Sequence, residues 1–243
     1  MNKHWKELDY YYYSTKIPRY EHDEIILSSS CIAHVLQLFD RTMEGYLTRQ
    51  QFADKLVFKI KDRFSEEKKR LMSNGVKNEA VMIEKYTNYI SSEFNREDIL
   101  ITTPFLCRPK FDTRLTCKSD GLIYINNKLD GLLEIKTTHT DKRMHKLRDI
   151  IDKLNDNEDF MNNYEELDSN NRHKFIESYH YAQVQFALQC YNVNWCDYII
   201  SYPAKDEHLL WRIEKNDKYW NEYMYPSIKS FLDFEINNSK RSK

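Results

Sequence analysis

The sequence lacks several features that would assign it to a simple class. It contains no run of 18 apolar residues, and its opening stretch, MNKHWKELDYYYY, lacks the apolar segment of a signal peptide. Its 37 basic and 38 acidic residues almost cancel, so it does not have the positive charge of a protein that coats nucleic acid. These absences predict a soluble intracellular protein with no membrane partner, in which positive charge is gathered locally wherever a polyanion binds.

Paired cysteine motifs are missing as well. The five cysteines contain no C-x-x-C pair, and an odd number cannot all pair within one chain. Disulfide frameworks and zinc sites are commonly built from such pairs, so neither is expected. The sequence therefore predicts reduced thiols.

What is present favours one α/β domain. The 243 residues, 41% of them hydrophobic, suffice for a single sizeable core. The pattern predicts an N-terminal helical region at 1–71, a core formed by 72–138 and 179–234, and a charged insertion at 141–178. The predicted elements, in order, are helices at 25–39 (with Ser28, Ser29 and Ser30 as candidate caps), 48–73 and 75–90, strands at 99–107, 115–125 and 129–138, a helix at 179–191, strands at 195–203 and 208–213, and a helix at 217–234 that bends near Pro226 and precedes a disordered tail.

One predicted helix carries an acidic residue on its apolar side. Val76, Ile83, Tyr86 and Ile90 recur at helical spacing and predict a stripe that faces the core. Glu79 falls on the same stripe. A carboxylate there is costly unless a partner compensates its charge, or unless it lies at the helix edge and bonds to the backbone or to a tyrosine.

Two charged residues lie within an apolar strand, GLLEIKTT. Because a strand alternates its faces, Glu134 and Lys136 project to the same side. Asp120 stands at the head of the preceding strand, and the turn at Asn126 and Asn127 folds the two strands together. In isolation, cross-strand pairing would explain Glu134 and Lys136, and ordinary turn chemistry would explain an aspartate before glycine.

Together these residues predict a site for Mg²⁺, with Mn²⁺ as the alternative. Asp120 and Glu134 offer the hard oxygen ligands that these ions prefer. A bound ion would activate a water molecule for attack on a phosphate, and Lys136 would orient that water or stabilise the charge that develops. Glu79 would complete the surroundings of the ion.

Five segments spread along the chain share the motifs of one family. They are MSNGVKNEAVMIEKY, KSDGLI, LLEIKTT, YHYAQVQFAL and WRIEKNDKYWNEY. In order, they resemble the Met-x-x-Gly-x-x-x-Glu helix, the S-P-D-G and L-E-I-K motifs, the Tyr-x-Gln-Val-Gln helix, and the closing strand and helix of the lambda-exonuclease/YqaJ viral recombinase branch of the PD-(D/E)xK nucleases. That branch includes viral alkaline nucleases. Residues 26–36 resemble its N-terminal I-T-A-S helix more weakly.

The resemblance implies a restriction-endonuclease-like fold, with a mixed central sheet flanked by helices and an αβββαβ core. It implies that the catalytic residues are Glu79, Asp120, Glu134, Lys136 and Gln183, and that the metal ligands come from Asp120, Glu134, Ile135 and Glu79. Contacts to DNA are expected from Ser30, Arg108, Arg114 and Tyr181.

The activity implied by the resemblance is digestion of double-stranded DNA, as a 5′→3′ exonuclease that leaves 3′ single strands. Relatives form a ring-shaped homotrimer and work with a single-strand-annealing protein, so both partnerships are expected here.

Two positions depart from the family pattern. Ser119 replaces the proline that precedes the metal-binding aspartate, and Asp23 stands where the family often has an arginine that contacts a DNA-end phosphate. Recognition of the 5′ end is therefore open. An endonuclease or RNase on the same scaffold, the iron–sulfur nuclease of CRISPR adaptation and a catalytically inactive DNA-binding module are the alternatives.

Overall fold

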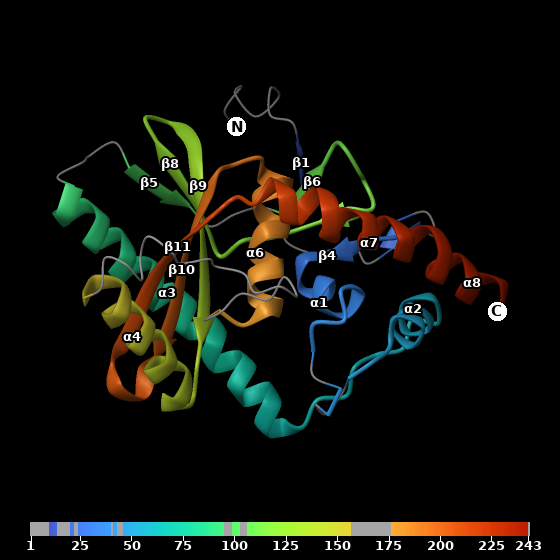
Figure 1. The fold of residues 1–243 in the computed structure, drawn as a ribbon, viewed down its shortest axis with the longest axis horizontal. Helices are drawn as coiled ribbons and strands as arrows, with labels where there is room; N and C mark the ends of the chain where they lie inside the picture. The colour runs from blue at the N-terminus through green and yellow to red at the C-terminus, as the bar shows by residue number, and fades with distance from the viewer. Residues whose placement is uncertain are drawn as a thin grey trace.

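A mixed five-stranded sheet organises the chain (Figure 1). The computed structural model describes residues 10–13, 20–21, 24–39, 41–42, 46–94, 99–102, 106–156 and 176–242. The strand order is β11 (Glu207–Glu214), β10 (Trp195–Tyr202), β9 (Lys128–Thr137), β8 (Gly121–Ile125) and β5 (Ile99–Thr102). β9 and β10 run parallel, and the other neighbours are antiparallel.

Helices cover both faces of this sheet. α3 (Glu66–Phe94) packs on one face, where Met82, Tyr86 and Ile90 meet Leu133 and other sheet residues. α6 (Ser178–Tyr191) packs on the opposite face, and α4 (Asp141–Asp156) lies against β10 and β11. The order α3, β5, β8, β9, α6, β10 confirms the predicted αβββαβ core.

The N-terminal region is not the helical segment that the sequence suggested. β1 (Tyr10–Tyr13) pairs with β6 (Leu106–Pro109), β2 (Tyr20–Glu21) pairs with β3 (Glu24–Ile25), and β4 (Leu27–Ser28) pairs with β7 (Leu115–Thr116). The helix predicted at 25–39 shrinks to a 3₁₀ turn, η2 (Ser29–Cys31), and the short α1 (Ile32–Val35). Its serines cap neither element; Ser28 Oγ instead bonds Ser30 Oγ at 2.8 Å.

Other boundaries also differ from the prediction. The helix expected at 48–73 divides into α2 (Arg49–Val57), which begins with a capping box between Thr48 and Gln51, and the start of α3. Val76, which was predicted to face the core, is 64% exposed. The strands predicted at 99–107 and 115–125 are each two shorter strands, β5 and β6, and β7 and β8.

The C-terminal part of the chain is helical for longer than predicted. η4 (Tyr219–Met224), α7 (Tyr225–Ser230), η5 (Phe231–Glu235) and α8 (Ile236–Arg241) follow one another, so the tail predicted to be disordered forms a helix. Within the predicted insertion, α4 buries Met144 completely and therefore belongs to the packed fold. Residues 157–175 of that segment lie outside the described residues.

All five cysteines are free thiols, as the sequence predicted. Among the helices of the described residues, none combines the length and the hydrophobicity needed to cross a bilayer.

Gly131 on β9 offers a test of the packing at the far end of the sheet. A Cβ at this position would lie 2.5 Å from the ring of Trp195. That ring cannot easily move, because its Nε1 donates to Asp130 Oδ2 at 3.0 Å and the guanidinium of Arg212 lies 3.9 Å from the ring centroid. We expect Gly131→Ala to lower the free energy of unfolding by about 2 kcal/mol, as overpacking does.

The matched control is Gly75→Ala in α3, where an added Cβ meets nothing within 4 Å. This change should raise the stability by up to about 1 kcal/mol, because alanine favours a helix over glycine. Urea unfolding midpoints of the two variants measure the difference. A Gly131→Ala protein as stable as the wild type would contradict the packing described for Trp195.

Candidate active site

One edge of β9 extends beyond the first residue of β8 and is not paired with that strand there. β8 pairs with residues 128–133 of β9, whereas β10 pairs with residues 132–137. Asp120, directly before β8, occupies the edge of β9 beyond the last β8 pair. Its backbone N–H donates to Leu133 O (3.1 Å), and its carboxylate Oδ2 accepts a hydrogen bond from Ile135 N (2.7 Å). The side chain of Asp120 thus extends the hydrogen-bond ladder by one residue.

Ser119 anchors the same point. Its hydroxyl donates to Leu133 O (2.7 Å), the carbonyl that also accepts from Asp120 N. The proline of the family pattern has no hydroxyl for this bond, so Ser119 replaces it with an additional contact between the two strands.

Glu134 lies on the α6 face of β9 and is 2% exposed. Its Oε1 accepts a hydrogen bond from Gln183 Nε2 of α6 (2.7 Å) and a short one from Lys136 Nζ. The structure therefore places Glu134 and Lys136 on one face, as strand alternation predicted, and brings Gln183 to the same carboxylate. A buried carboxylate with two donors is held in one orientation.

The main chain of Ile135 faces the same edge as Asp120. In an extended strand the N–H and C=O of one residue point to the same side, and the N–H of Ile135 points to Asp120. Its carbonyl oxygen is therefore directed to that edge, while its side chain packs under α3. Two carboxylates and one main-chain oxygen border this end of β9.

Burial raises the pKa of each carboxylate of the site. Burial and the charge of Asp120 raise the pKa of Glu134 to about 7. Burial raises the pKa of Asp120, and burial together with Asp120 raises the pKa of Glu79, which approaches from α3. Burial alone would lower the pKa of Lys136, but Glu134 and Asp120 outweigh it and raise this pKa. The three carboxylates outnumber the two ammonium groups that act on them, those of Lys136 and Lys118.

The donor set fits a hard divalent cation. Among the described residues, no three histidine, cysteine, aspartate or glutamate side chains gather closely enough to hold a metal ion by themselves. The protein ligands would instead be the carboxylates of Asp120 and Glu134 and the carbonyl of Ile135, with water in the remaining positions, as Mg²⁺ commonly keeps. Such an ion would also compensate the excess negative charge.

Two of the predicted DNA contacts are wrong. Tyr181 is 1% exposed and packs against Tyr219 in the core, so its side chain has no surface for DNA. Arg108 is 9% exposed and donates to the carbonyl of Thr113. A buried side chain cannot meet a phosphate in bulk solvent.

The other two predicted contacts lie nearer the surface. Arg114 is partly exposed, but its guanidinium pairs with Asp112 (2.8 Å) and Asp233 (2.9 Å), so a phosphate would have to compete with two carboxylates. Ser30 is exposed at η2, which packs beside α6. Asp23 lies outside the described residues.

The sequence did not single out Asn78. Its Nδ2 donates to Thr137 Oγ1 (2.9 Å) and ties α3 to β9 between Glu79 and Lys136. An asparagine on a polar turn of a helix is too common to indicate a function. Only its position next to Glu79 could have identified Asn78 from the sequence.

Comparisons with known proteins identify a family for this chain. The family described as YqaJ-like viral recombinase domain matches residues 21–193, which include Glu79, Asp120, Glu134, Lys136 and Gln183. No curated protein matches the chain significantly.

The solved structures that resemble the fold include two of one enzyme. They are an alkaline exonuclease, LHK-Exo, from Laribacter hongkongensis (18% identity, TM-score 0.57) and LHK-Exo in complex with dAMP (18% identity, TM-score 0.58). Each similarity covers 89% of this chain and 92% of the other. The fold is restriction-endonuclease-like. Because the family match spans well over half of the 243 residues, the chain belongs to the YqaJ-like viral recombinase domain family, in the lambda-exonuclease branch of the PD-(D/E)xK superfamily.

Proposed function

We propose that this protein is a Mg²⁺-dependent deoxyribonuclease that digests double-stranded DNA from its 5′ ends. The observation that carries the proposal is the group at the open end of β9: buried Glu134 bonded to both Lys136 and Gln183, with Asp120 on the adjacent edge. Hydrolysis of a phosphodiester needs hard oxygen ligands for a cation and a positive group near the phosphate, and this group contains both.

Each residue has a distinct role in this proposal. Asp120, Glu134 and the carbonyl of Ile135 bind the cation, which when bound polarises the phosphate and lowers the pKa of water. Lys136 orients the attacking water and donates a hydrogen bond to the phosphate oxygens on which negative charge develops. Gln183 fixes the orientation of Glu134, and Glu79 contributes a further carboxylate from α3. Mn²⁺ has similar ligand preferences and would substitute for Mg²⁺.

The exonuclease mode is supported by a protein of the same fold. LHK-Exo is described as an alkaline exonuclease, and it forms a complex with dAMP, a mononucleotide. We extend this mode to the present chain, together with the 5′→3′ direction, the homotrimer and the annealing partner that the family resemblance implies. Ser30, exposed beside α6, is the proposed contact to the DNA end.

One experiment tests the activity and its mode. Linear duplex DNA labelled at either the 5′ or the 3′ end is incubated with the protein, with Mg²⁺ present or chelated, beside closed circular DNA and RNA. The expected result is early release of the 5′ label as a mononucleotide, only with Mg²⁺, and no cleavage of circles or RNA. Cleavage of closed circles would establish an endonuclease, cleavage of RNA an RNase, and binding without any cleavage an inactive module.

A further inference from the structure

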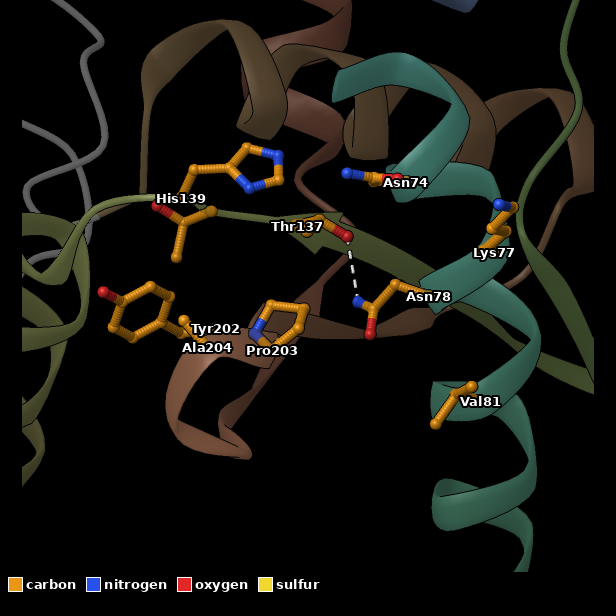
Figure 2. Close-up of a pocket in the computed structure, with 10 residues that line it drawn as sticks. Asn74, Lys77, Asn78, Val81, Thr137, His139, Tyr202, Pro203 and Ala204 are labelled. Carbon is orange, nitrogen blue, oxygen red and sulfur yellow. Dashed lines mark hydrogen bonds between the residues drawn. The ribbon is translucent and has the colours of Figure 1, made fainter. Parts of the chain in front are cut away.

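A pocket of about 370 Å³ lies beside the candidate active site (Figure 2). Three segments line it: residues 74–81 of α3, residues 137–139 at the end of β9, and residues 202–204, where β10 passes into η3 (Pro203–Lys205). Its volume falls within the range of about 300–1,000 Å³ typical of small-molecule sites. Neither the sequence motifs nor the family match assigns a role to it.

Two residues of the pocket lining are direct chain neighbours of proposed catalytic residues. Asn78 directly precedes Glu79 on α3, and Thr137 directly follows Lys136 on β9. Figure 2 shows the hydrogen bond of 2.9 Å that joins Asn78 and Thr137 at the pocket wall. Because successive residues of a strand face opposite sides, Lys136 faces α6 while Thr137 faces α3. The pocket therefore lies around the edge of β9 from Glu134, on the side where Glu79 approaches.

The lining combines apolar side chains with side chains that can form hydrogen bonds. Val81, Pro203 and Ala204 are apolar, and Tyr202 adds an aromatic ring. The polar side chains come from α3 and the end of β9 and are Asn74, Asn78, Thr137 and His139. In Figure 2, Asn74 and His139 face each other across the pocket. A nucleobase has matching surfaces, since its faces are flat and stack on rings while its edge carries donors and acceptors.

We propose that this pocket holds the base of the nucleotide next to the scissile phosphate. The proposal rests on the proposed nuclease function, because it requires a phosphodiester held at Lys136. Lys77, exposed on the same stretch of α3, adds a positive charge near the backbone of that nucleotide. A base bound here fixes the phosphate relative to Lys136 and raises the share of complexes in which the reacting atoms are correctly placed.

Binding of two small probes tests the proposal. In the presence of Mg²⁺, calorimetry compares dAMP with 2-deoxyribose 5-phosphate, which has the sugar and phosphate but no base. We expect the wild type to bind dAMP about tenfold more tightly, as about 1.4 kcal/mol of base contacts would give. In the double variant Asn74→Ala/His139→Ala this preference should fall below about threefold, with unchanged affinity for the sugar phosphate. Ala204→Trp, which fills the pocket from an exposed position, should abolish the preference.

The matched control is Asn88→Ala/His208→Ala, which removes the same side chains from exposed positions of α3 and β11 outside the pocket lining. It should keep the wild-type preference for dAMP. Equal affinity of the wild type for the two probes, or a full preference for dAMP in the pocket variants, would overturn the base subsite. Digestion of linear duplex by the same wild-type preparation separates this result from failure of the nuclease proposal. If the protein digests DNA but binds both probes equally, the base subsite is refuted and the nuclease proposal stands.

Discussion

Replacing Lys136 by alanine should lower the rate of DNA cleavage about 100- to 1,000-fold while DNA binding changes little. The side chain of Lys136 is 22% exposed and its ammonium contacts Glu134, so it acts within the site and not on the outer surface that meets the duplex. A group that stabilises charge arising only during the reaction contributes to kcat far more than to ground-state affinity. Single-turnover cleavage of labelled duplex and a binding titration measure the two quantities separately.

Lys118→Ala is the matched control for this prediction. Lys118 is exposed, and its charge acts on Asp120 and Glu79 from a distance without a hydrogen bond to either in the structure. Because exposed charges are strongly screened, its removal should change cleavage by no more than about threefold. Full activity of Lys136→Ala, or an equal loss in both variants, would show that the role assigned to Lys136 is wrong.

Replacing Asp120 by asparagine should abolish the stabilisation that Mg²⁺ gives to the folded protein, together with cleavage. Asparagine has nearly the same shape, and its carbonyl oxygen can still accept the hydrogen bond from Ile135 N, so the fold should persist. The lost negative charge weakens a site built on two carboxylates. At a concentration 100 times its dissociation constant, a bound ion stabilises the wild type by about 2.7 kcal/mol. Thermal unfolding with and without Mg²⁺ measures this effect.

Asp130→Asn supplies the comparison. Asp130 also precedes a glycine in the same hairpin, but its carboxylate accepts from Trp195 Nε1 (3.0 Å), away from the site. This variant should keep both the Mg²⁺ response and the activity. If Asp120→Asn responded to Mg²⁺ as the wild type does, Asp120 could not be a principal ligand.

The sequence predicted the parts of the site that depend on local periodicity. Alternation along GLLEIKTT placed Glu134 and Lys136 on one face, and the Asn126–Asn127 turn correctly joined β8 to β9. Both follow from rules that act over a few residues. The family motif added Gln183, which no periodicity identifies, and the structure bonds it to Glu134.

The sequence failed where the outcome depends on distant partners. β1 and β4 are short strands whose partners, β6 and β7, lie far along the chain, so the local pattern at the N-terminus gave no sign of them. Helical periodicity identified the buried side of α3 at Tyr86 and Ile90, but Val76, on the same predicted stripe, is exposed. The exposure of an arginine or tyrosine side chain also depends on which distant segments pack over it. This explains why Arg108 and Tyr181 were predicted to be accessible to DNA.

The C-terminal tail illustrates the same dependence. Its sequence is rich in asparagine, serine and lysine, yet α8 packs on α2. Ser239 Oγ donates to Asp54 Oδ1 (2.7 Å), and Gln50 Nε2 donates to Ser239 Oγ (2.7 Å). Tertiary contacts here outweigh the low intrinsic helix propensity of the segment.

The bond from Ile135 N to Asp120 links the alignment of two strands to the proposed binding of an ion. Were β8 to slip by one position along β9, every side chain of that strand would change faces, and the carboxylate would leave its place next to the Ile135 carbonyl. Under the proposed metal assignment, misaligned molecules would lose their affinity for a cation, and a cation present during folding would favour the chains whose hairpin has closed correctly. Cleavage of DNA would then be confined to copies that have folded properly.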